Sequence, residues 1–330
     1  MTAIAQAQPN IALVKYWGKR DTALNLPAAD SLSITLASLS TRTEVTFDPT
    51  LEHDVLLLNG APDARTLARA SACLDVLRER AGNPCRAHVD TRNNFPTAAG
   101  LASSASGFAA LVMAANAALG LPEDRPWLST IARQGSGSAA RSLYGGFVHM
   151  HAGSREDGAD AHAEPLLEAG AWPLEVVVAV TTRKAKAVGS GEGMERTRRT
   201  SPFYGQWAGT VADDIVLARA AVAARDFEAL AAVSEHSCLK MHALMLSSQP
   251  PLMYWSPATL ACMQMVRQLR ERDGLGVFFT VDAGPQVKAV CLPADAAKVA
   301  AALREVSGVE AILRSALGKG ARNVPMAEVA

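Results

Sequence analysis

The chain has 330 residues, 49% of them hydrophobic, and its 32 basic and 32 acidic side chains cancel. A chain of this length can bury a large core and divide into two lobes. The balanced charge excludes a general attraction to nucleic acid or to an anionic membrane surface, so any anion must be bound locally.

The cysteines and the N-terminus bear on the cellular compartment. The five cysteines are scattered and form no Cys-x-x-Cys pair, which predicts reduced thiols and argues against a zinc site or a disulfide framework. The first ten residues lack the basic and apolar segments of an export signal, and no later segment reaches the roughly 18 apolar residues of a membrane helix. We therefore expect a cytoplasmic protein without a membrane span.

The first predicted strand runs over residues 10–14 and ends in a cluster of aromatic and cationic side chains, namely Lys15, Tyr16, Trp17, Lys19 and Arg20. Such a cluster either protects an exposed strand edge or approaches a ligand, and Trp17 beside Gly18 favours a ligand. Alternating residues then predict strands at 31–36 and 43–47, which we expect to form an antiparallel pair.

An amphipathic helix is predicted over residues 64–81, with leucines on one stripe and arginines on the opposite, solvated face. A short strand at 86–91 follows and leads into a run of small residues and then an apolar helix. Unpaired N–H groups at such a helix start can hold an anion, so Gly100, Ala102, Ser103 and Ser104 are candidates for binding phosphate. An ordinary loop before a buried helix is the alternative.

A second loop of small residues, at 135–146, follows a short helix predicted over 126–133. Its hydroxyls on glycine-flanked backbone, Ser136 and Ser138 around Gly137, can turn toward an anion. Arg141 adds a planar guanidinium fork that suits a phosphate or a carboxylate. Most Gly/Ser turns are only loops, but the nearby arginine favours anion recognition.

The middle of the chain contains a buried strand at 174–180, preceded by a polar surface loop at 154–163, which places the boundary between lobes near 170–185. The next segment, 181–200, is rich in glycine and cations. It is either a mobile flap that brings charge to bound phosphates or a disordered surface connector, and composition alone favours the connector.

The last third is predicted to be helical at 207–225, 227–246 and 257–272, with His242 as a hydrogen-bonded core residue. A strand at 278–281 ends at Asp282, and 286–292 forms its partner. Asp282 is either a turn former or, if the fold brings it to the phosphate loops, a catalytic base. The residues from 317 onward predict a polar, frayed tail.

Five blocks of the sequence resemble the diphosphomevalonate decarboxylases, members of the GHMP kinase superfamily. They follow the order and spacing of that family over about residues 8–292, most of the chain. The blocks are 10–20 (NIALVKYWGKR), 93–111 (NNFPTAAGLASSASGFAAL), 135–146 (GSGSAARSLYGG), 241–243 (MHA) and 281–285 (VDAGP).

The resemblance implies an α+β fold of two lobes with a cleft for ATP and substrate between them. The N-terminal lobe, 1–178, would resemble a ribosomal protein and carry the phosphate loop, and the ferredoxin-like C-terminal lobe, 179–330, would carry the catalytic aspartate. The family reaction phosphorylates the 3-hydroxyl of mevalonate 5-diphosphate with ATP and then releases phosphate and CO₂, giving isopentenyl diphosphate. The family commonly forms homodimers.

The resemblance also implies roles for individual residues. Asp282 would orient or deprotonate the 3-hydroxyl, Lys15 would pair with it, Asn10 would order the site, and Arg141 would hold the carboxylate that leaves as CO₂. Gly100, Ala102, Ser103 and Ser104 would contact the ATP phosphates, and Mg²⁺ would bind through those phosphates, with Ser104 as a candidate ligand. The ligands of the substrate's phosphate end would be Tyr16, Lys19, Ser136, Gly137, Ser138 and Ser190.

Three positions depart from the family pattern: Ala29 replaces a frequent asparagine, Gly191 replaces an arginine of some bacterial relatives, and Ala140 replaces a frequent cysteine. The first two leave fewer donors for a phosphate tail, so a decarboxylase of mevalonate 5-phosphate is the alternative. A mevalonate 3-kinase without decarboxylation and a non-catalytic nucleotide-binding relative are further alternatives. The presence of Asp282 with Lys15 argues against both.

Overall fold

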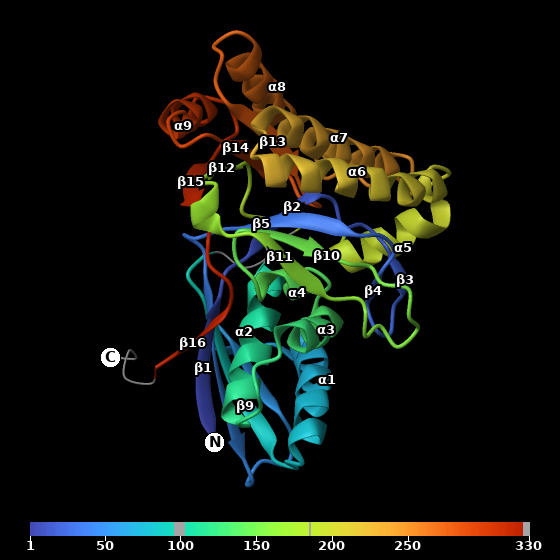
Figure 1. Cartoon of the computed structure of the whole chain (residues 1–330), viewed down its shortest axis with the longest axis vertical. Helices are drawn as coiled ribbons and strands as arrows, with labels where there is room; N and C mark the ends of the chain where they lie inside the picture. The colour runs from blue at the N-terminus through green and yellow to red at the C-terminus, as the bar shows by residue number, and fades with distance from the viewer. Residues whose placement is uncertain (96–102, 185, 326–330) are drawn as a thin grey trace.

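The computed structural model describes residues 1–95, 103–184 and 186–325, and it is built in layers along its long axis (Figure 1). A six-stranded sheet lies at one end, followed by helices α1 to α4, a four-stranded sheet, helices α6 and α7 with a second four-stranded sheet, and finally α8 and α9. This arrangement confirms the predicted two-lobed α+β fold.

The first sheet has the strand order β16-β1-β6-β9-β7-β8, and only the β7–β9 pairing is parallel. Its strands are β1 (Thr2–Ala7), β6 (Thr41–Asp48), β7 (Val55–Leu58), β8 (Ala61–Pro62), β9 (Arg86–Asn93) and β16 (Arg322–Val324). The second sheet has the order β11-β10-β5-β2, with β2 (Asn10–Val14), β5 (Ser31–Thr35), β10 (Phe147–Met150) and β11 (Ala163–Leu167). A hairpin of β3 (Lys19–Asp21) and β4 (Leu26–Pro27) projects beside it.

The third sheet has the order β13-β14-β12-β15 and is antiparallel throughout, with β12 (Glu175–Val180), β13 (Val277–Val281), β14 (Val287–Cys291) and β15 (Ala311–Ala316). The predicted division into 1–178 and 179–330 stays a prediction; β12 lies across it and pairs with β14 and β15. The helices of the N-terminal half are α1 (Ala64–Ala81), α2 (Ser103–Ala118), α3 (Arg125–Gly135) and α4 (Ala139–Ser142). Those of the C-terminal half are α5 (Ser190–Thr200), α6 (Tyr204–Ala224), α7 (Phe227–Leu246), α8 (Pro257–Glu271) and α9 (Ala296–Arg304), and a 3-10 turn at Ala169–Ala171 lies between the two groups.

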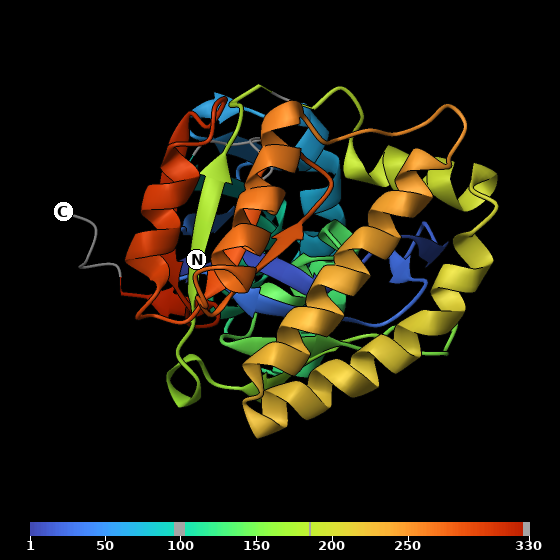
Figure 2. The same ribbon diagram turned by 90° about the horizontal axis from the view of Figure 1, so that it is seen from above.

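Three apolar clusters hold the layers together. Helices α1 to α4 fill the space between the first sheet and one face of the second sheet. The opposite face of the second sheet packs against α6 and α7, which lie side by side above it (Figure 2). Helices α8 and α9 cover the outer face of the third sheet. The second sheet therefore packs on both faces, and the two halves of the chain meet across it.

The strands predicted at 31–36 and 43–47 both form, but the prediction that they pair with each other is wrong. β5 pairs with β2 and β10, whereas β6 pairs with β1 and β9. β1 pairs with β6 at the position where β5 was expected. The small and polar side chains of β1 do not predict a strand. Neighbours in the sequence are therefore assigned to different sheets by pairings with distant segments.

Two predictions of irregular chain are also wrong. Residues 190–200, expected to be a disordered connector, form α5, whose basic residues pair with glutamates one turn away, as Arg196 does with Glu192 at 2.7 Å. The tail predicted to fray from residue 317 instead pairs as β16 with β1. Residues 326–330 lie outside the described part of the chain.

The arginine face of α1 is only partly solvated, which corrects another expectation. Arg78 is buried and donates to Asp54 at 2.7 and 3.1 Å, and it also pairs with the exposed Asp75.

No helix among the described residues is long and apolar enough to cross a membrane.

Candidate active site

Asp282 follows β13 and lies between two buried lysines. Its Oδ1 is 2.7 Å from Lys15 Nζ, and its Oδ2 is 3.2 Å from Lys288 Nζ. The lysine side chains are 1% and 2% exposed, whereas the aspartate is 32% exposed. The carboxylate is thus partly exposed to solvent, while the two lysines that hold it are buried.

This setting determines the protonation state of Asp282. Burial alone would raise the pKa of its carboxyl, but the charges and hydrogen bonds of Lys15 and Lys288 outweigh burial and hold the pKa well below its usual range. Asp282 is therefore a carboxylate at neutral pH, and a weak base.

Lys15 is fixed by both halves of the chain. Its Nζ also donates to Ala12 O at 2.8 Å, and its backbone N–H donates to Ser237 Oγ of α7 at 3.0 Å. Thr280 of β13 donates to the same Ala12 carbonyl at 3.3 Å. The end of β2 is therefore bonded directly to α7 and β13, and this junction places Asp282 beside the N-terminal half.

Arg141, in the single-turn helix α4, is 2% exposed and makes its hydrogen bonds to neutral side chains. Its Nη1 donates to Ser31 Oγ at 2.6 Å, and its Nε donates to Asn10 Oδ1 at 3.3 Å. Among the described residues, no carboxylate lies within ion-pair distance of its guanidinium. Burial lowers the pKa of Arg141 to about 10, so the side chain keeps its charge at neutral pH. An anionic ligand is the partner that this charge lacks.

Asn10 orients that arginine. Its amide nitrogen donates to Ser142 Oγ at 2.8 Å and to Ser138 O at 2.9 Å, which leaves Oδ1 free to accept from Arg141. Asn10 therefore ties the first residue of β2 to both ends of α4.

The second small-residue loop brings three serine hydroxyls together. Ser136 Oγ is 3.3 Å from Ser138 Oγ and 3.2 Å from Ser104 Oγ, at the start of α2. Gly137 is required here, because a Cβ atom would lie 2.3 Å from the Tyr16 hydroxyl. That hydroxyl is buried without a hydrogen-bond partner among the described residues, and burial raises the pKa of Tyr16 to about 12, so it stays a neutral donor.

Two cations lie near the serine loop. Lys19 of β3 is half-buried, and burial together with the charge of Arg69 lowers the pKa of Lys19. Arg69 of α1 donates to Gly135 O at 3.0 Å, at the start of the serine loop. Hydroxyl donors beside crowded cations form a site suited to phosphate oxygens.

Lys186 links the segment before α5 to Asp282. Its Nζ donates to Ser190 Oγ at 2.6 Å and to Ala283 O at 2.8 Å. Burial lowers the pKa of Lys186 to about 8, although the nearby charge of Asp282 raises it again in part. Ser190, predicted as a phosphate ligand, is thus held on the Asp282 side of the site.

The remaining predicted residues have mixed outcomes. Ser103 and Ser104 begin α2, whereas Gly100 and Ala102 lie outside the described residues. His242 is a core residue as expected: its Nε2 lies 3.2 Å from Val281 O and 3.3 Å from Trp255 Nε1, and burial lowers its pKa to about 3. Trp17, considered as a ligand contact, is 2% exposed and belongs to the core.

Sequence reasoning missed Lys288, Lys186, Arg69 and Ser31. Lys288 stands in the apolar strand β14, VKAVC, and nothing beside it in the sequence shows that the lysine faces Asp282. Arg69 is indistinguishable from the solvated arginines of its helix. Ser31 reads only as one member of an alternating strand.

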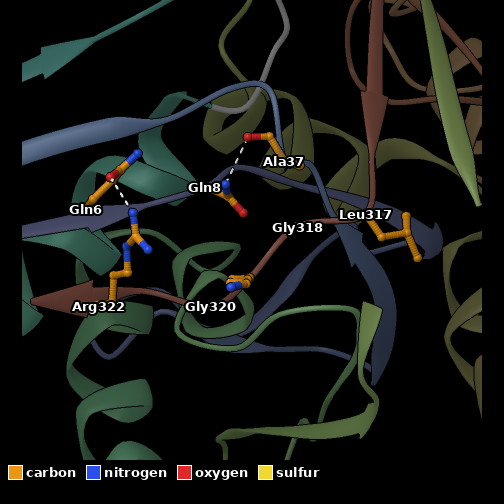
Figure 3. Close-up of a pocket in the computed structure, with 8 residues that line it drawn as sticks. Gln6, Gln8, Ala37, Leu317, Gly318, Gly320 and Arg322 are labelled. Carbon is orange, nitrogen blue, oxygen red and sulfur yellow. Dashed lines mark hydrogen bonds between the residues drawn. The ribbon is translucent and has the colours of Figure 1, made fainter. Parts of the chain in front are cut away.

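A hollow of about 270 Å³ elsewhere on the surface is not part of this site (Figure 3). It is formed where β16 and the turn before it meet β1, and it is lined by Gln6, Gln8, Ala37, Leu317, Gly318, Lys319, Gly320 and Arg322. None of the predicted site residues lines it.

Comparison with known families matches nearly the whole chain. Residues 7–163 match the diphosphomevalonate decarboxylase-like N-terminal domain, and residues 176–327 match the mevalonate 5-diphosphate decarboxylase C-terminal domain. The diphosphomevalonate decarboxylase of Aspergillus fumigatus is 40% identical over 325 residues, which cover 93% of this chain and 80% of that protein. The human diphosphomevalonate decarboxylase is 37% identical over 320 residues, covering 90% and 78%.

Solved structures agree with these matches. Mevalonate diphosphate decarboxylase from Staphylococcus aureus superimposes with a TM-score of 0.91 at 38% identity, over 98% of both chains. A complex described as MDDEF with MVAPP, AMPPCP and magnesium superimposes with a TM-score of 0.90 at 37% identity, over 99% of both chains.

Proposed function

The chain belongs to the diphosphomevalonate decarboxylase family and is an ATP-dependent decarboxylase, and we propose that Asp282 and Arg141 hold the two reacting ends of mevalonate 5-diphosphate. Asp282 would face the 3-hydroxyl that receives the phosphoryl group, and Arg141 would face the carboxylate that leaves. The observation that carries this assignment is the position of a partly exposed carboxylate on two buried lysines.

Asp282 acts by orienting the hydroxyl. A carboxylate whose pKa is held low accepts a hydrogen bond well but removes a proton poorly. The hydroxyl proton therefore passes to Asp282 only as the oxygen forms its bond to the γ-phosphorus of ATP and ADP departs. Positioning of the attacking oxygen and neutralisation of the phosphate charge together supply most of the rate enhancement in such a transfer.

Arg141 holds the carboxylate in one orientation for the second stage. The C3–oxygen bond breaks and its electron pair leaves with the phosphate. The bond to the carboxyl carbon then breaks, and its electrons form the new double bond as CO₂ departs. Arg141 is already hydrogen-bonded to Ser31 and Asn10, so its guanidinium is fixed before the substrate arrives.

The phosphate groups of the two substrates are assigned to two neighbouring sets of residues. Tyr16, Lys19, Ser136, Gly137, Ser138 and Ser190 form the proposed site for the substrate's diphosphate. The N-terminus of α2, with Ser103 and Ser104, forms the proposed site for the nucleotide phosphates, and Gly100 and Ala102 complete the proposed loop. Four cations, Lys15, Lys186, Lys288 and Arg141, exceed the single carboxylate of Asp282, which fits a pair of polyanionic substrates. Bound Mg²⁺ neutralises nucleotide phosphate charge, and Ser104 is the proposed hydroxyl ligand.

Replacing Asp282 by asparagine tests the central assignment. The change keeps the shape of the side chain but removes the charge, and we expect turnover to fall by about 10²-fold or more, as for other lost electrostatic contacts. Binding of ATP, followed by calorimetry, should change little. Asp273→Asn, at an exposed turn, is the matched control. Turnover near the natural rate in Asp282→Asn would remove the residue from the reaction.

We propose a cytoplasmic homodimer, and sedimentation of the purified chain tests the dimer through its mass. A monomer at micromolar concentration would contradict it.

A further inference from the structure

A second cluster of polar side chains lies on the face of the second sheet that is turned away from Arg141. β5, β10 and β11 are neighbours in that sheet (Figure 1). His149 stands opposite Leu32 of β5 and opposite Glu164 of β11. Because side chains two residues apart share a face of a sheet, Asp30, His149, His151 and Glu164 converge on one side.

The distances in this cluster are short. His149 Nε2 is 2.9 Å from Asp30 Oδ2, and His151 Nε2 is 3.2 Å from Glu164 Oε1. The rings of His149 and His151 are 4.1 Å apart, and one ligand atom from each of Asp30, His149 and His151 lies within 4.8 Å of the others. Three strong metal-ligating atoms therefore already surround a common point.

The ligands are held in place and reachable. Asp30 Oδ1 accepts the backbone N–H of Ala152 at 2.8 Å, which turns Oδ2 toward His149. His149 is 4% exposed and fixed in the strand, whereas Asp30 and His151 are 33% and 34% exposed. An ion can therefore arrive from solvent and meet a pre-oriented imidazole.

We propose that Asp30, His149 and His151 form a binding site for Zn²⁺. Two imidazole nitrogens and one carboxylate oxygen are a ligand set that zinc accepts in tetrahedral sites with water in the fourth position. The imidazoles favour zinc over Mg²⁺, which prefers oxygen ligands. The site is distinct from the catalytic one, because Ser31, which holds Arg141, points to the opposite face of the sheet from Asp30.

The neighbouring groups determine which hydrogen bonds the ion must replace. Arg219 of α6 donates to Glu164 Oε1 at 2.6 Å and lies 2.7 Å from His149 Nδ1. Because a guanidinium only donates, Nδ1 accepts from Arg219 in the metal-free chain, and Nε2 carries the ring proton toward Asp30. Binding of the ion at Nε2 moves the ring proton to Nδ1, which then donates to Glu164 Oε1, 3.5 Å away, as Arg219 releases Nδ1. Arg219 keeps its bond to Glu164. The bound ion would join β5 to β10 beneath α6, where the two halves of the chain meet.

Titration of the tag-free, full-length chain with ZnCl₂, followed by calorimetry and metal analysis after dialysis, tests the proposal. We expect one Zn²⁺ per chain and no binding of MgCl₂ under the same conditions. Asp30→Asn and His151→Ala, each at a partly exposed position, should each weaken Zn²⁺ binding at least about 10-fold. His53→Ala removes an exposed imidazole in a distant turn and should leave binding unchanged.

A second readout separates lost ligands from lost folding. Zn²⁺ should raise the thermal midpoint of the natural chain and of His53→Ala, but not that of His151→Ala, whose metal-free midpoint should match the natural chain. Absence of Zn²⁺ binding by the natural chain would overturn the proposal and leave the cluster as a hydrogen-bonded contact between α6 and the sheet. Binding that survives unchanged in both Asp30→Asn and His151→Ala would overturn it as well.

Discussion

Two buried arginines show how partners, more than burial, decide the role of a residue. Arg133 and Arg141 are 1% and 2% exposed, and burial lowers the pKa of each to about 10. Arg133 donates to backbone carbonyls, among them Gly158 O at 2.8 Å and Leu24 O at 3.3 Å. Arg141 bonds to the side chains of Asn10 and Ser31. The first arginine closes a loop, and we propose that the second presents its charge to a ligand.

Replacing Arg133 by glutamine should therefore affect stability, whereas replacing Arg141 by glutamine should affect turnover. Arg133→Gln leaves buried carbonyls unpaired and should lower the free energy of unfolding by about 2–3 kcal/mol, measured in urea. Arg141→Gln should lower turnover by about 10²-fold with little change in ATP affinity. A larger effect of Arg141→Gln on ATP affinity than on turnover would move Arg141 to the nucleotide side of the site.

Lys186 predicts a pH dependence. Because its pKa is lowered to about 8, its charge is present below pH 8 and is lost as the pH rises through that value. If this charge binds phosphate, kcat/KM for ATP should fall above about pH 8, since this ratio reports the free enzyme. Lys186→Arg keeps its charge and should abolish the decline. The same decline in both proteins would assign it to another group.

The individual site residues were predictable to different degrees. Asn10, Lys15, Arg141 and Asp282 stand in distinctive blocks, and the structure brings all four together. Lys186 and Lys288 were missed because their partners, Ala283 O and Asp282, become neighbours only through the pairing of β12, β13 and β14. Burial of a lysine depends on that long-range pairing, which the residues beside it do not encode.

At the scale of elements, one buried ion pair fastens α1 to the first sheet. Asp54 accepts two hydrogen bonds from Arg78 and one from the backbone N–H of Ala87 on β9, at 2.8 Å. Asp54→Ala should lower the free energy of unfolding by about 3–5 kcal/mol, because it leaves a buried guanidinium without its main partner. Asp75→Ala removes the 59%-exposed partner and should cost about 0–1 kcal/mol. Equal losses in urea denaturation would contradict this account.

Helices, buried strands and the local pairing of β13 with β14 were predicted well, whereas pairings between distant segments were not. The amphipathic stripe of α1, capped by Asp63 and ended by Gly82 at φ 62°, is a local signal that the sequence carries fully. The pairing of β6 with β1, and of β1 with β16, joins segments far apart in the chain. β5 was assigned to the wrong partner, and the tail was called irregular, for this same reason.

At the scale of the whole molecule, the proposed active site lies where the two halves of the chain meet. Lys15 directly follows β2, Ser237 lies in α7 and Asp282 directly follows β13, and hydrogen bonds join all three. The resemblance to a two-lobed family predicted this meeting, whereas periodicity and composition did not. The proposed zinc site lies at the same junction, on the other face of the shared sheet.

Coupling of phosphoryl transfer to decarboxylation is the central feature of the proposed reaction. Supplying the purified chain with ATP, Mg²⁺ and mevalonate 5-diphosphate, and measuring ADP and CO₂ in the same samples, tests that coupling directly. We predict that the two products appear in equal amounts, and faster than with mevalonate 5-phosphate. ADP without CO₂ would contradict the account and indicate a 3-kinase, and faster release of CO₂ from the monophosphate would contradict the assignment of the diphosphate.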